Sequence, residues 1–124
     1  PPPSSRTMAN CYLSEFEQGR IAVRSARTGA GFGLAWHPAV FRYAWIWQAL
    51  GGGIGYPRYG RTYNMGIEPW TSFPCAGLNE ALARGTARQL GPGEHLDTWL
   101  TAVAYTGAPA VAAIDRDGTV TAEE

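Results

Sequence analysis

Short apolar stretches separated by turn-forming residues run along the whole chain. The 124 residues include 16 Gly and 9 Pro, which interrupt segments rich in Val, Ile, Tyr and Trp. This rhythm is typical of an all-β fold. The segments that we predict to be strands are 10–13, 20–26, 32–36, 43–49, 63–68, 85–90, 96–105, 110–114 and 119–122.

One segment follows a helical pattern instead. Residues 78–84 read Leu-Asn-Glu-Ala-Leu-Ala-Arg and are bounded by Gly77 and Gly85. These helix formers suffice for about two turns. Since no repeat or boundary interrupts the rest of the chain, we predict one domain over 1–124. The expected architecture is an antiparallel β-sandwich with one short helix near 78–84.

Side chains alternate most clearly between the two faces of the predicted strand in residues 95–103. Both faces carry bulky side chains. This suits a sandwich strand with one face in a core and the other lining a groove or a second sheet. The first face holds Leu96, Thr98, Leu100 and Ala102, and the second holds Asp97, Trp99, Thr101 and Val103.

Two glycine-containing motifs are predicted to be ordinary loops. Residues 115–118, Asp-Arg-Asp-Gly, lie between two apolar runs and predict a hairpin turn with a positive φ at Gly118. The distal Glu of a calcium loop is absent, so no metal site is implied. Residues 51–55, Gly-Gly-Gly-Ile-Gly, precede Tyr-Pro-Arg-Tyr rather than a helix that would hold a phosphate. We therefore predict neither a metal nor a cofactor.

The net charge limits the class of ligand that we expect. The search for membrane-spanning and targeting segments limits the expected cellular compartment. The ten basic residues, all Arg, balance ten acidic ones, so neither nucleic acid nor an anionic membrane is indicated and a neutral ligand is expected. No run of about 18 apolar residues suggests a membrane span, and the amino terminus lacks a targeting pattern. We predict a cytoplasmic protein, while the Pro-Pro-Pro start also resembles a cut through a longer chain.

The Cys and His residues and the pair Glu15 and Glu17 form no recognisable catalytic arrangement in the sequence. Cys11 and Cys75 fit no zinc or redox spacing, which favours two free thiols and leaves a single disulfide as the alternative. His37 and His95 have no neighbouring Ser, Cys or His in sequence, and we interpret both as surface residues. Glu15 and Glu17 are interpreted as a solvated edge.

The aromatic residues offer two interpretations. The five Trp are numerous for this length, and Trp45 and Trp47 share one strand face with Tyr43. Composition alone favours a core. The alternative is a platform on which the apolar face of a sugar packs while its hydroxyls meet Arg, Asn or a carboxylate. The five are Trp36, Trp45, Trp47, Trp70 and Trp99.

Glu68 is the lone carboxylate of an aromatic-rich strand, Tyr63-Asn-Met-Gly-Ile-Glu-Pro-Trp70. Burying an ionised carboxylate without partners is costly. A strand that carries one therefore either points it at solvent or aims it into a functional cleft.

These motifs resemble a known family. The run from Tyr56 to Pro74 (YPRYGRTYNMGIEPWTSFP), the segments GLNEA and GTARQLGPGE within 77–94 and the Trp45-Ile-Trp-Gln strand look like the carboxy-terminal half of the galactose mutarotase-like (aldose 1-epimerase) superfamily. The similarity spans roughly Tyr12 to Tyr105. It implies part of a large antiparallel supersandwich and interconversion of the α and β anomers of a free aldose.

The resemblance also implies roles for residues. Glu68 matches the family's catalytic glutamate, which takes the proton from the C1 hydroxyl while a His donates to the ring oxygen. The acid histidines of the family belong to the amino-terminal half, and neither His37 nor His95 lies at a matching position. Pro69-Trp70 follows Glu68 here, where mutarotases tend to have Thr-Gln. The groove residues implied beside Glu68 are Trp70, Trp45, Trp47, Arg58 and Arg61.

Three functions remain open from the sequence. The first is an epimerase-like sugar protein, the second a non-catalytic carbohydrate-binding module, and the third a structural domain whose aromatics are only core. A half sandwich leaves strand edges and an apolar face uncovered. We therefore expect either a homodimer or an amino-terminal half that covers them.

Overall fold

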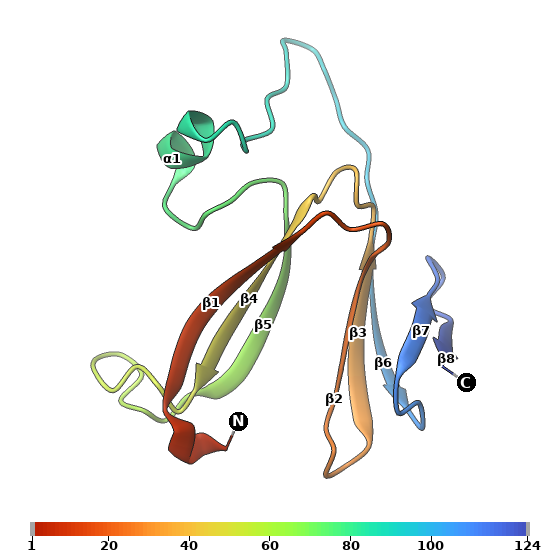
Figure 1. The fold of residues 1–124 in the computed structure, drawn as a ribbon. Coiled ribbons are helices and arrows are strands. Elements are labelled where there is room, and N and C mark those ends of the chain that lie inside the picture. Colours follow the sequence, from red (N-terminus) through yellow and green to blue (C-terminus); the bar gives the residue numbers. More distant parts are fainter. Residues whose placement is uncertain (1, 124) are drawn as a thin grey trace. The chain divides into compact units, whose positions relative to one another are not determined.

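The computed structural model describes residues 2–123, and its strands form antiparallel sheets (Figure 1). Within this range one α-helix occurs, so the prediction of an all-β fold with a single short helix is confirmed. The chain forms two compact units. Unit 1 comprises 2–15 and 42–88, and unit 2 comprises 16–41 and 89–123.

Unit 1 is built on a three-stranded sheet with a short 3-10 helix, Pro3–Ser5, before it. Its strands are β1 (Thr7–Ser14), β4 (Tyr43–Leu50) and β5 (Tyr63–Trp70), in the order β1-β4-β5. Burial alternates along the first half of β4. Ala44 and Ile46 are buried, whereas Tyr43, Trp45 and Trp47 are only partly buried. The aromatic side of β4 is therefore the more accessible one.

A loop over residues 71–77 leads from β5 to α1 (Leu78–Ala83). Buried Thr86 links the two segments, because its hydroxyl donates to the carbonyl oxygens of Phe73 and Ala81 and accepts from the Phe73 amide at 3.4 Å. The strand that we predicted over 85–90 is wrong. Gly85 has a φ of 66°, and the Thr86 amide bonds back to Ala81 at 2.9 Å, so this backbone turns instead of extending along a ladder.

Unit 2 contains a second three-stranded sheet and a hairpin. The sheet orders β2 (Gly19–Arg24), β3 (Ala30–Trp36) and β6 (Leu100–Thr106) as β2-β3-β6. The hairpin joins β7 (Val111–Ile114) to β8 (Val120–Ala122).

The prediction that the last long strand begins at residue 96 is wrong by four residues. Trp36, the final residue of β3, pairs with Leu100, so residues 96–99 have no partner strand. Along β6 the side chains of Thr101, Val103 and Tyr105 are partly buried, whereas Leu100 and Ala102 are exposed. Only one of the two bulky faces is therefore packed.

The core of unit 2 lies between β3 and the hairpin. Ala35, Val111 and Ile114 are buried together, with Val103 and Val120 against them. The predicted turn at 115–118 is confirmed, since Gly118 has a φ of 92° and its amide bonds to the Asp115 carbonyl at 3.0 Å. Hydrogen bonds from the backbone and hydroxyl of Thr119 lower the pKa of Asp117.

Within residues 2–123, no helix combines the length and the hydrophobicity needed to cross a membrane.

Candidate functional site

Three of the four rows of cross-strand neighbours on the more accessible face of the unit 1 sheet contain an aromatic residue of β4. In an antiparallel sheet, directly opposed residues place their side chains on the same face. The register therefore aligns one residue from each of β1, β4 and β5 in every row. The three rows with an aromatic residue of β4 are Asn10–Trp47–Gly66, Tyr12–Trp45–Glu68 and Ser14–Tyr43–Trp70. Glu68 thus lies beside Trp45 and between Gly66 and Trp70 along its own strand.

Indole rings form the floor of this face. Trp45 and Trp70 are stacked, with ring centroids 4.3 Å apart and an interplanar angle of 17°. Tyr12 meets Trp45 edge-on at 5.8 Å. Each stacked indole covers one face of the other, and Trp70 keeps 40% of its surface exposed. Such contacts suit a flat apolar surface.

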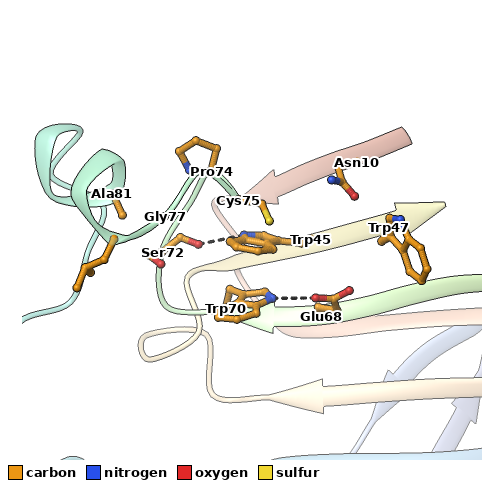
Figure 2. A pocket seen from close by; sticks show the side chains of 11 residues that line it. Asn10, Trp45, Trp47, Glu68, Trp70, Ser72, Pro74, Cys75, Gly77 and Ala81 are labelled. Carbon is orange, nitrogen blue, oxygen red and sulfur yellow. Dashed lines mark hydrogen bonds between the residues drawn. The ribbon is translucent and has the colours of Figure 1, made fainter. Parts of the chain in front are cut away.

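A cavity of about 650 Å³ opens over these rings (Figure 2). Its size lies within the range of small-molecule sites. Most of its lining is apolar or aromatic, and Glu68 is the only charged residue among the residues found to line it. The lining residues are Asn10, Trp45, Trp47, Glu68, Trp70, Ser72, Pro74, Cys75, Gly77, Leu78 and Ala81.

Among the residues that the structure describes, Glu68 accepts one hydrogen bond. The Trp70 indole donates to its Oε2 atom at 3.1 Å (Figure 2). Within residues 2–123, no Arg or His lies within 4 Å of its carboxylate as an ion pair. A Cβ on Gly66 would lie 2.8 Å from Oε1. The glycine therefore provides the space into which this oxygen extends.

The loop 71–77 forms one wall of the cavity. The Trp45 indole donates to the Ser72 carbonyl at 3.0 Å, and the Cys75 amide donates to the Tyr12 hydroxyl at 3.3 Å. Together with Thr86, which fixes Phe73, these bonds attach the wall to the sheet. The cavity is thus built by elements that bond to one another within unit 1.

The structure gathers four of the six residues that we predicted for the site. Glu68, Trp70, Trp45 and Trp47 all line the cavity. Arg58 does not line it, although its guanidinium carbon lies 5.1 Å from the centre of the Trp47 ring. Arg61 is exposed and lies outside the lining. The roles of all six remain predictions.

Sequence reasoning missed Asn10, Ser72 and Cys75. Asn10 enters the site only because β1 pairs with β4 in a register that puts it opposite Trp47, and no local pattern signals that register. Ser72 and Cys75 follow Glu68 closely in the sequence. Their position in the loop after an aromatic strand end was a usable signal.

The core interpretation of the tryptophans holds for one of the five and fails for another. Trp36 is buried at 1% relative exposure and donates to the Phe41 carbonyl at 3.0 Å. Trp70 is 40% exposed. Trp45, Trp47 and Trp99 are partly buried. The tryptophans therefore divide between a packed role and an accessible one.

The remaining candidates, apart from Cys75, lie away from the cavity lining. His37 and His95 are exposed, as predicted, and so are Glu15 and Glu17. Cys11 and Cys75 are free and exposed, which confirms the thiol interpretation. Among residues 2–123, no group of three His, Cys, Asp or Glu side chains is arranged to hold a metal ion.

Comparison of the chain with protein-family models, curated proteins and solved structures finds no match. The resemblance to the mutarotase-like superfamily stays a prediction, and the chemistry of the site rests on the geometry above.

Proposed function

We propose that this chain binds a carbohydrate in the unit 1 cavity, as an aldose 1-epimerase-like sugar protein. One observation carries the proposal. A carboxylate, Glu68, stands beside stacked indoles, Trp45 and Trp70, in a cavity large enough for a small molecule.

A sugar ring has two kinds of surface, and this site offers a partner for each. Its axial C–H groups form an apolar face that packs on aromatic rings, and its hydroxyls seek hydrogen-bond acceptors and donors. The partly exposed indoles suit the first surface. The Oε1 atom of Glu68 and the amide of Asn10 suit the second, because both residues line the cavity.

Binding is better supported than catalysis. Anomer interconversion needs a base and an acid on opposite sides of the sugar, and Glu68 offers only the base. No histidine is among the described residues that line the cavity. If the reaction occurs, we propose that another chain supplies its acid.

A second copy of this chain is the partner that we propose, with an amino-terminal half of a longer protein as the alternative. Within the described residues, β1 and β5 each pair with a neighbour on one side only, and Leu13 and Met65 on these strands are 43% exposed. Unpaired edges and exposed apolar side chains favour association. Light scattering should give the mass of a dimer; a monomer's mass at every concentration tested would count against it.

A cytoplasmic location is part of the same proposal. Two exposed free thiols, Cys11 and Cys75, suit a reducing compartment.

Calorimetric titration with a panel of free aldoses tests sugar binding. We expect at least one aldose to bind the wild type and to bind Glu68→Gln more weakly, since the amide accepts hydrogen bonds less strongly than the carboxylate. Glu123→Gln is the matched control, because it removes the same charge from an exposed position in unit 2. If no aldose binds, sugar binding is refuted.

Polarimetry separates an enzyme from a binder. Freshly dissolved α-glucose or α-galactose should relax at the same rate with wild type, with Glu68→Gln and with buffer alone if the chain only binds. A faster rate with wild type that Glu68→Gln removes would instead assign catalysis to Glu68.

A further inference from the structure

We propose that the unit 1 cavity selects ligands carrying an ammonium group, and that its sugars are amino sugars rather than neutral or acidic ones. This inference rests on the proposed sugar-binding function and deepens it by naming the substrate class.

The first observation is the charge of the cavity. Glu68 is the only charged residue among its lining residues, and no cationic side chain forms an ion pair with it within residues 2–123. An unpaired carboxylate in a mostly apolar site attracts a cation more strongly than it would in water. A neutral sugar leaves that charge without a counterion, and an acidic sugar adds a second negative charge to the site.

The second observation is the supply of hydrogen-bond donors. Both indole N–H groups that belong to the stacked pair are already used, that of Trp45 by the Ser72 carbonyl and that of Trp70 by Glu68. An indole has only this one donor. Trp47, Asn10 and Ser72 also carry donors in the lining. The Oε1 atom of Glu68 is an acceptor, so a ligand group that meets this carboxylate must bring donors. An ammonium group brings three and accepts none.

The third observation is the aromatic surface around the carboxylate. Indole faces are the aromatic surfaces that attract cations best, and Trp45, Trp47 and Trp70 all line the cavity with Glu68. The chain already uses one of these rings in this way, because the Arg58 guanidinium carbon lies 5.1 Å from the centre of Trp47. Arg58 is not among the residues that line the cavity. A cationic group of the ligand would therefore be the cation that contacts Glu68.

Taken together, the site combines one anionic acceptor, indole faces and a neutral amide at Asn10. The ammonium group would meet Glu68 and an indole, while the C–H face of the ring packs on the remaining aromatic surface. Simple alkylammonium ions carry the same charge without the hydroxyls. They therefore separate the attraction for a cation from the recognition of a sugar.

The test is a calorimetric titration of the full chain with matched ligands at about pH 6, where the amine of glucosamine is protonated. The ligands are glucosamine, glucose, N-acetylglucosamine, glucuronate and methylammonium. We expect glucosamine to bind about fivefold more tightly than glucose, and glucuronate to bind most weakly. N-acetylglucosamine, which keeps the nitrogen and loses its charge, should lose the preference.

Two further measurements attribute the preference to Glu68. In Glu68→Gln the ratio of glucosamine to glucose affinity should fall to about one, whereas Glu123→Gln should keep the wild-type ratio. Raising the salt to about 1 M should also reduce the ratio, because it screens charges at an open site. A thermal melt of each variant verifies that it is folded.

The outcomes distinguish the inference from the function on which it rests. Equal binding of glucose and glucosamine overturns ammonium selection and leaves sugar binding standing. Binding of methylammonium with no sugar bound supports ammonium selection and overturns sugar binding. Absence of binding by all five ligands overturns both, and a glucosamine preference unchanged in Glu68→Gln overturns the role of the carboxylate.

Discussion

Both units contain a glycine directly opposite an aromatic residue on the neighbouring strand, but the pairs are used differently. In unit 2, Gly19 faces Trp36 and Gly31 faces Tyr105. In unit 1, Gly66 faces Trp47. The difference lies in what occupies the space above each glycine.

In unit 2 the aromatic side chain fills that space. A Cβ on Gly31 would collide with the Tyr105 ring, and one on Gly19 would lie 2.8 Å from the Cδ1 and Nε1 atoms of the Trp36 indole and strike the Trp36 carbonyl oxygen. Rings that cover cross-strand glycines pack the sheet and stabilise its register. These pairs are therefore structural.

In unit 1 the aromatic ring leaves the glycine uncovered. A Cβ on Gly66 would meet Oε1 of Glu68 at 2.8 Å, while the nearest atom of Trp47 is its Cβ at 3.6 Å. The space serves a carboxylate at the edge of a cavity. The same pair of residue types thus packs a sheet in one unit and makes room for a polar group in the other.

The largest expected effect separates the two tryptophans. Trp36→Ala should cost about 3–5 kcal/mol of unfolding free energy, because it empties a fully buried site. Trp47→Ala should cost about 1–2 kcal/mol, because that ring is only partly buried. Urea unfolding followed by circular dichroism measures both. Similar costs for the two variants would contradict the contrast.

The next effect tests the packed glycine. Gly19→Ala should cost about 1–3 kcal/mol, since its methyl group meets backbone and a buried ring that have no room to move. Gly55→Ala is the control, because no atom lies within 4 Å of the added Cβ. A Gly19→Ala protein as stable as the Gly55→Ala protein would show that the strand relaxes around the methyl group.

The smallest effect on stability is expected at Gly66, which the neighbouring aromatic ring does not cover. Gly66→Ala should change the unfolding free energy by less than about 1 kcal/mol, because the atom that it meets is the end of a flexible side chain. It should nevertheless weaken ligand binding about tenfold, or about 1.4 kcal/mol, by displacing the Glu68 carboxylate. Calorimetry with the best-binding aldose checks this, and an unchanged affinity would mean that the carboxylate position is unimportant.

Local sequence pattern was enough to locate most of the strands. Of the nine strands predicted from alternation and turn residues, seven match an observed strand, with only small shifts at their ends. Gly77 and Gly85 also marked the ends of the helix correctly. The failures were long-range. Residues 96–99 have strand-like composition but no partner strand within residues 2–123, and the segment after Gly85 bonds back to Ala81.

The candidate site was predicted in part for the same reason. Trp45 and Trp47 belong to one strand and Glu68 and Trp70 to another, and period-two geometry puts each pair on one face of its own strand. The register of β4 with β5 then puts both pairs on the same face of the sheet. Arg58 and Arg61 belong to a loop, where no such rule applies. Asn10 depended on pairing between strands more than thirty residues apart, which local pattern does not specify.

The sequence by itself determined the all-β class, the short helix and the presence of an aromatic strand ending near a lone carboxylate, because these depend on neighbours within a few residues. Only the tertiary structure decided which tryptophans are buried, which glycine stays uncovered and that Glu68 lines a cavity with Asn10 and Ser72. Those properties depend on register and burial, which arise when distant strands pair and pack.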